Sequence, residues 1–164
     1  MVRIACEVKP HSSCLVPEKR QELTTEGGLD VVGQRDKVRA AVEKLHEAGI
    51  VVSCFIDPVE AQLDAAKEVG ADYVELHTGT YSNTVGEARR QELERLKAAA
   101  EHAHKIGLSV NAGHGIDYEN IAGILEIPHL SELNIGHSII GRAIMVGMER
   151  AVGEMLEAMK PYSK

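Results

Sequence analysis

The sequence predicts an α/β fold with a parallel sheet, and two observations support this prediction. Short runs rich in β-branched residues alternate with longer segments whose apolar residues recur at helical spacing. Glycine and polar residues gather where several of these runs end, and residues 111–114 and 134–137 both read Asn-x-Gly-His. Such groups suit the carboxyl ends of parallel strands, where α/β proteins bind their ligands. We therefore expect a single domain over residues 1–164, with its functional groups at one end of the sheet.

The chain opens with a short helical segment over residues 1–7, which we expect to pack through Ile4 and to lead directly into the first strand. Five strands are predicted, each a short apolar run bounded by glycine, proline or polar residues. The strands lie near residues 13–16, 51–56, 73–77, 108–112 and 133–136.

Longer amphipathic segments between these strands predict helices. After the first strand, Val38, Val42 and Leu45 fall on one helical stripe, and Gly49 supplies the stop. After the second strand, Asp57 is expected to cap a helix whose first residue is Pro58 and which ends at Gly70; proline is tolerated at the first helical position.

The second half of the chain repeats this alternation. A long helix rich in Glu, Arg and Ala is predicted over residues 87–106, and Asp117 is expected to cap a shorter one. The last strand leads into a helical stretch over residues 138–159, which Gly147 and Gly153 are expected to interrupt.

Strand parity indicates which way the polar side chains point. In the third strand, Tyr73, Glu75 and His77 share one face, and the apolar residues between them share the other. The same counting turns Asn111 and Asn134 to the face of Glu75. A doubly wound sheet prefers apolar residues on both faces, whereas the mouth of a barrel accepts inward polar groups. The pattern favours a barrel wall, although a closed (β/α)₈ barrel has eight strands, three more than are predicted here.

Composition excludes several classes of function. The net charge of −7 and the isoelectric point near 5.6 oppose binding to nucleic acid or to an anionic membrane surface. Cys6, Cys14 and Cys54 are odd in number and show no Cys-x-x-Cys spacing, so we expect reduced thiols. The residues show neither an export signal nor an apolar run long enough to span a membrane, and a cytoplasmic protein is expected.

Five segments together resemble the pyridoxine 5'-phosphate synthase family: residues 14–21, 24–30, 75–79, 110–115 and 134–137. The resemblance covers essentially the whole chain. It implies a TIM (β/α)₈ barrel of which this chain covers about five β/α units, strands four to eight, with the first three strands absent. It also implies a homo-oligomer without a metal or organic cofactor.

The activity that this resemblance implies is a transferase reaction of vitamin B6 biosynthesis. The family condenses 1-deoxy-D-xylulose 5-phosphate with 3-amino-2-oxopropyl phosphate to form pyridoxine 5'-phosphate, phosphate and water. Position by position, His114 matches the proton donor of the family, and Glu75 matches the carboxylate that stabilises the transition state. The substrate-binding positions are matched by Thr24, Gly115, Gly136 and His137.

Two alternatives remain open. The first three strands of the family carry a histidine and arginine pair and the glutamate that acts as a general base, and no residue here matches them. A chain of this kind is expected to be a poor catalyst alone, or a non-catalytic remnant that retains a phosphate pocket. The second alternative is a metal-dependent barrel hydrolase, since His77, His114, His137 and Glu75 are suitable ligand types.

Overall fold

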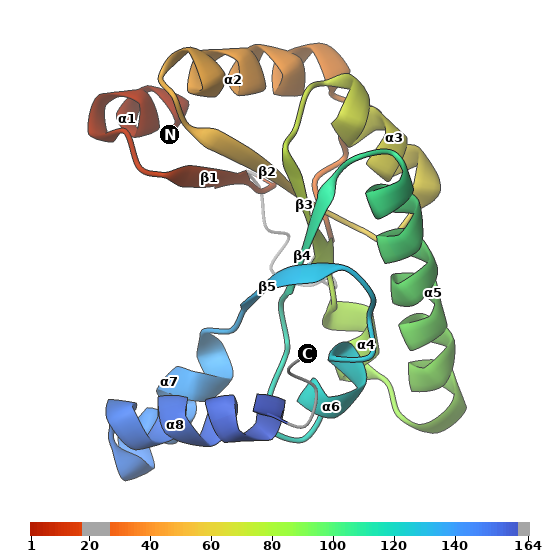
Figure 1. Ribbon diagram of the computed structural model, residues 1–164, viewed down its shortest axis with the longest axis vertical. Helices are drawn as coiled ribbons and strands as arrows, with labels where there is room; N and C mark the ends of the chain where they lie inside the picture. The colour runs from red at the N-terminus through yellow and green to blue at the C-terminus, as the bar shows by residue number, and fades with distance from the viewer. Residues whose placement is uncertain (18–26, 161–164) are drawn as a thin grey trace.

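Five parallel strands form one sheet in the order β1-β2-β3-β4-β5 (Figure 1). The computed structural model describes residues 1–17 and 27–160. Each strand pairs with the one before it in the chain, with at least one helix between them, which confirms the predicted α/β alternation. The strands are β1 (Ser12–Leu15), β2 (Val51–Ile56), β3 (Tyr73–His77), β4 (Ser109–Gly113) and β5 (Leu130–Asn134).

The helices lie mainly along one side of the curved sheet (Figure 1). In this side layer, α2 and α3 pack on β2, and α5 packs on β3 and β4. The last two helices, α7 and α8, form a hairpin beyond β5. The helices are α1 (Val2–Val8), α2 (Arg35–Glu47), α3 (Glu60–Glu68), α4 (Gly79–Asn83), α5 (Gly86–Lys105), α6 (Ile121–Ile124), α7 (His137–Val146) and α8 (Met148–Met159).

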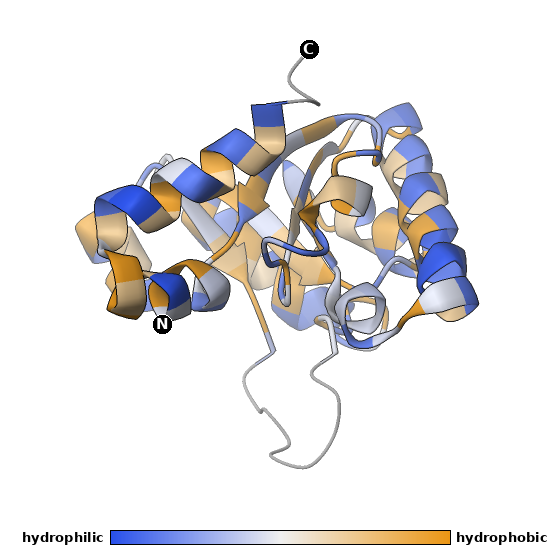
Figure 2. Cartoon of the chain, turned by 90° about the horizontal axis from the view of Figure 1, so that it is seen from below, coloured by the Kyte–Doolittle hydropathy of each residue, from blue (hydrophilic) through white to orange (hydrophobic). Residues whose placement is uncertain are grey.

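The core lies between the sheet and these helices. Val74 and Leu76 of β3 are fully buried, as strand parity predicts, and they face the helical layer. Leu63 of α3 and Leu96 of α5 pack into the same cluster. Figure 2 shows apolar strands at the centre and a long helix, α5, on which polar stretches alternate with apolar ones. Because side chains alternate along a strand, burial of the apolar set on this face places the remaining side chains on the opposite face of the sheet.

That opposite face is open. Cys14 and Asn134 on it are exposed, and Glu75 is partly exposed. Among the described residues, no sixth strand pairs with β1 or β5, so both remain edge strands. The described fold is therefore an open α/β sheet. None of its helices could cross a membrane within the described residues.

Besides Asp117, which lies three residues before Asn120, the N-cap of α6, four details differ from the sequence prediction. Strand β5 covers Leu130–Asn134 rather than 133–136, since Leu130 already pairs with Val110 of β4; a register irregularity follows at Val110/Asn111. The first helix does not pack through Ile4, which is 46% exposed; its neighbours Ala5 and Cys6 reach the core instead.

The third difference concerns Asp57, which does not cap a helix. Helix α3 begins at Glu60 after Val59, and Pro58 precedes it. The fourth concerns Gly153, which lies inside α8, whereas Gly147 alone separates α7 from α8 with φ +85°. A backbone of this kind is open to glycine and strained for other residues.

Candidate active site

Polar residues from three neighbouring strands meet at one end of the sheet. The register places Glu75 of β3 beside Asn111 of β4, and Gly113 of β4 beside Asn134 of β5. His114 follows β4 directly. Because all strands run the same way, their carboxyl ends bring these groups to a common edge. The structure thus confirms the predicted placement of Glu75, Asn111 and Asn134 on one face.

Glu75 is the carboxylate at the centre of this group. Asn134 Nδ2 donates to Glu75 Oε2 at 2.9 Å, and Cys14 Sγ lies 3.6 Å from the same oxygen. Desolvation raises the pKa of Glu75 and exceeds the opposing effects of these two hydrogen bonds; the nearby Glu132 carboxylate raises it further. A Cβ at Gly113 would overlap Glu75 Oε1, so glycine at this position leaves the carboxylate its room.

Cys14 and Cys54 are poor nucleophiles in this setting. Desolvation raises the pKa of the buried Cys54 thiol to about 12. Cys14 is an exposed residue, but its thiol lies against the sheet beside Glu75, and desolvation together with the Glu75 carboxylate raises its pKa to about 12 as well. All three cysteines are free thiols, as the sequence predicts. The site therefore offers carboxylate, amide and imidazole chemistry rather than a thiolate.

His77 is buried at the end of β3, with 5% of its side chain exposed. Its Nδ1 lies 2.9 Å from Asp57 Oδ1, and the Gly28 backbone N–H donates to the same oxygen at 3.1 Å. The hydrogen bond from His77 lowers the pKa of Asp57, so this residue stays a carboxylate. The ring of His77 also contacts Phe55 and His114, with centroids 5.1 Å away in each case.

His114 stands at the mouth of the site on a strained backbone, with φ +83°. The buried Thr78 holds this turn: its Oγ1 lies 2.8 Å from Gly113 O and 2.6 Å from His114 O. Gly115 follows with φ +77°, and a Cβ there would lie 2.7 Å from Ser82 Cβ. The peptide from 113 to 115 thus adopts a conformation that presents the exposed His114 side chain.

Asn111 carries an unsatisfied group at the floor of the site. Its side chain is buried, and Oδ1 has no hydrogen-bond partner among the described residues. Buried polar atoms without a partner are uncommon and concentrate at functional positions. The amide stands beside Glu75 in the register, where it is available to a ligand.

Among the described residues, no hydrogen bond, ion pair or ring contact joins Gly136 or His137 to this group. Gly136 precedes α7 and His137 is its first residue, and both are exposed. Thr24 lies outside the described residues. Sequence reasoning missed Asp57, which it treated as a helix cap. Its position directly after β2, at the same end as Glu75 and His114, was the signal that could have found it.

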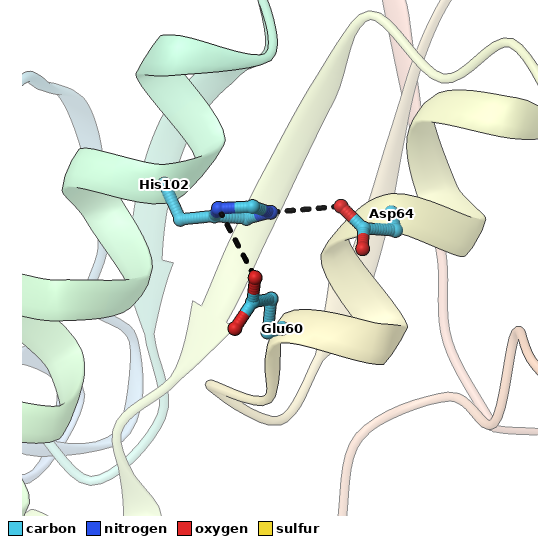
Figure 3. A group of neighbouring side chains, drawn as sticks. All are labelled: Glu60, Asp64 and His102. Carbon is cyan, nitrogen blue, oxygen red and sulfur yellow. Dashed lines mark hydrogen bonds and ion pairs between the residues drawn. The ribbon is translucent and has the colours of Figure 1, made fainter.

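A second cluster of ionisable groups lies elsewhere, between α3 and α5 (Figure 3). His102 Nε2 lies 2.7 Å from Asp64 Oδ1, and Nδ1 lies 3.8 Å from Glu60 Oε1. Among the described residues this is the only set of three possible metal ligands within 4.8 Å of one another. The histidines proposed for a hydrolase centre, together with Glu75, form no such set. The geometry therefore does not support the metal-dependent alternative.

Comparison with known proteins gives one family and a common fold. The family model described as pyridoxal phosphate biosynthesis protein PdxJ matches residues 1–161. A thiamine phosphate pyrophosphorylase from Pyrococcus furiosus superposes with a TM-score of 0.67 at 18% identity, covering 100% of this chain and 66% of that one.

Two further solved structures share the fold. The Amycolatopsis orientalis BexX/CysO complex gives a TM-score of 0.58 at 18% identity, covering 96% of this chain and 61% of that one. A xylose isomerase domain protein from Planctomyces limnophilus gives 0.55 at 15% identity, covering 92% and 66%. At these identities the likeness concerns the fold alone. The chain spans about two thirds of the length of these structures.

Proposed function

Because this chain belongs to the PdxJ family of pyridoxal phosphate biosynthesis proteins, we propose that its site carries out pyridoxine 5'-phosphate synthase chemistry. The reaction condenses 1-deoxy-D-xylulose 5-phosphate with 3-amino-2-oxopropyl phosphate, and phosphate and water leave as the pyridine ring closes. The observation that carries the proposal is the placement of Glu75 within the last three residues of β3 and of His114 directly after the adjacent β4. Gly113 leaves room for the Glu75 carboxylate, and Gly115 follows His114 with a positive φ that suits glycine.

In this proposal His114 is the proton donor. The unperturbed pKa of histidine lies near neutrality, about 6.5, which suits repeated delivery of protons to departing oxygens. Glu75 stabilises positive charge that develops on the imine nitrogen of the condensing substrates. Its partly desolvated position strengthens such an interaction, because the effective dielectric constant there is lower than in water.

We propose that phosphate binds across Gly115, Gly136 and His137, with Thr24 as a further substrate contact. Helix α7 begins at His137, so its first N–H groups are available to an anion. Loops after the last two strands of a TM barrel commonly hold phosphate. No organic cofactor or metal takes part in the proposed reaction, and the active form is proposed to be a homo-oligomer.

The open sheet is best explained as five consecutive β/α units of a TIM (β/α)₈ barrel. Polar groups on its uncovered face then line a barrel interior, and the buried apolar face meets the outer helices. Coverage of 61–66% of the three solved structures supports this explanation. The open face also admits water to the site, so we expect the chain alone to turn over slowly.

A binding and turnover experiment on the full chain tests this function. Calorimetry is expected to detect each phosphorylated substrate, and replacement of His137 by Ala is expected to weaken that binding. Product formation is expected to fall by about 10²-fold or more in H114N, as for loss of a general acid. The control is H104N, because the exposed His104 stacks on His129 away from the site.

The outcomes separate the synthase from the remaining alternative. The synthase is supported if the wild type and H104N turn over slowly and H114N does not turn over at all. Binding of phosphorylated substrates without any product supports a non-catalytic phosphate-binding remnant. Absence of both binding and turnover contradicts the proposed function.

A further inference from the structure

Asp57, His77 and His114 form a chain of contacts that the proposed reaction does not yet use. Asp57 follows β2, His77 ends β3 and His114 follows β4, so three adjacent strands supply one residue each. Asp57 is hydrogen-bonded to His77 at 2.9 Å, and the His77 and His114 ring centroids lie 5.1 Å apart, so His77 contacts both of the other residues. The Phe55 ring meets the His77 ring edge-on and lies 6.4 Å from the His114 ring, so it packs beside both histidines.

The Asp57 carboxylate fixes the protonation pattern of His77. A carboxylate accepts hydrogen bonds and donates none, so the nitrogen facing it, Nδ1, carries the proton. In the neutral imidazole Nε2 is then an unprotonated acceptor. The Gly28 N–H holds Asp57 Oδ1 from a second side, which restricts movement of the carboxylate.

His77 Nε2 is buried and has no hydrogen-bond partner among the described residues. An unsatisfied buried polar atom is unfavourable, because no hydrogen bond in the protein replaces the one it loses to water. Gly79 packs at this atom, because a Cβ there would lie 2.5 Å from His77 Nε2 and 3.1 Å from His114 Cδ2. The edge of the His114 ring and the unsatisfied acceptor therefore lie beside the same glycine.

A half-turn of the His114 ring about its Cβ–Cγ bond exchanges Cδ2 with Nδ1, and this torsion is soft in histidine. The two ring centroids lie 5.1 Å apart, which is close enough for a hydrogen bond between ring nitrogens that face each other. We propose that His77, oriented by Asp57, is a positioning residue whose Nε2 accepts a hydrogen bond from His114 Nδ1 in the working site.

This inference rests on the proposed function, in which His114 delivers a proton. The Nε2–H bond of the His114 imidazolium breaks, its electron pair stays on Nε2, and the proton joins the departing oxygen. The neutral imidazole that remains keeps its proton on Nδ1, and this Nδ1–H donates a hydrogen bond to His77 Nε2. The pair thus determines which nitrogen of His114 exchanges protons with substrate.

Nitrogen-15 NMR of the histidine-labelled full chain tests the arrangement without any need for turnover. Above its titration range, His114 is expected in the Nδ1–H form in the wild type. It is expected to keep this form in H77Q, whose amide oxygen can accept, and to change to the Nε2–H form in H77F, which keeps bulk and loses the acceptor. H114N assigns the signals.

The variant D57N tests the same inference independently of any change at His77. In D57N the amide can donate to His77 Nδ1, so His77 loses its fixed pattern and His114 is expected to lose the Nδ1–H form. The matched control is D64N, because Asp64 pairs with His102 in the same chemistry on the outer helices (Figure 3). Where turnover is measurable, kcat is expected to fall about 10–100-fold in H77F and D57N with KM little changed.

An Nδ1–H form of His114 that persists in both H77F and D57N overturns the inference. If H77F does not fold, D57N and H77Q decide the matter by the same signal. Failure of the synthase proposal shows as absent product with the nitrogen signals behaving as expected, so the two hypotheses fail separately.

Discussion

At the scale of single residues, the ionised Glu75 carboxylate lowers the stability of the folded chain. Its surroundings raise the pKa above the ordinary value of 4.5, mainly by desolvation. A carboxyl of this kind binds its proton more tightly in the folded state than in the unfolded one. Stability therefore falls as the pH rises through the window between 4.5 and the raised pKa, and it stays reduced above that window.

We expect E75Q to unfold at a higher denaturant concentration than the wild type at neutral pH, because glutamine carries no charge to desolvate. The amide oxygen still accepts from Asn134. Urea titrations across the pH range check this, and the advantage is expected to shrink below pH 4.5, where both side chains are neutral. E43Q, at an exposed position of α2, is the control. An E75Q chain less stable than wild type at neutral pH would contradict the interpretation.

Thr78 stabilises the strained turn at His114. Its hydroxyl is within 2.8 Å of two carbonyl oxygens and is fully buried. T78V keeps the shape and removes the donor, and we expect the free energy of unfolding to fall by about 1–3 kcal/mol. The matched change T80V, at an exposed neighbour, is expected to stay within about 0.5 kcal/mol. Equal effects of the two variants would show that the hydroxyl does not hold the turn.

At the scale of secondary-structure elements, a single glycine separates the last two helices. Gly147 has φ +85° and ψ +155°, a region that side chains other than glycine rarely adopt. Arg142 of α7 bonds to Glu154 of α8 across this break, and Arg150 bonds to Glu154 from within α8; together they lower the pKa of Glu154 to about 2. The break at Gly147 and the Arg142–Glu154 ion pair across it together fix the angle of the hairpin.

We expect G147A to lower the free energy of unfolding by about 1–3 kcal/mol, because alanine is strained in this backbone region. G153A provides a control of opposite sign. Gly153 lies within α8 with no atom near its missing Cβ, so alanine there is expected to stabilise the chain by up to about 1 kcal/mol. Thermal unfolding of both variants measures the pair. A neutral G147A would mean that α7 and α8 can join without this conformation.

At the scale of the whole molecule, apolar surface remains uncovered on α7 and α8. Six apolar side chains of this hairpin are between 37% and 80% exposed. Contiguous apolar patches on a protein surface usually mark interfaces. We define this apolar surface by its residues: Ile140, Ile144, Met145, Met148, Val152 and Leu156.

We expect the chain to self-associate through this surface, in keeping with the proposed homo-oligomer. Sedimentation velocity over a range of concentrations is expected to show species larger than the 17.8 kDa monomer. I144K is expected to shift the distribution toward monomer, because a buried unpaired ammonium opposes association. V85K, at an equally exposed apolar position before α5, is the control. A monomer at every concentration would contradict this expectation.

The sequence by itself determined the order of elements and the face of each strand. Val74 and Leu76 alternate with Tyr73, Glu75 and His77, and a period of two leaves only one way to bury the apolar set. The same reasoning placed Asn134 with Glu75, and the structure joins them by a hydrogen bond. Local patterns carry this information because burial of one face acts on each strand separately.

Only the tertiary structure decided the role of Asp57 and the contacts of His77. Asp57 followed by proline has the local signature of a helix start, and its carboxylate instead bonds to residues 29 positions before it and 20 positions after it. The true start of β5 likewise depended on pairing with β4. Such contacts join distant parts of the chain, so their energies appear only when neighbouring strands are in register.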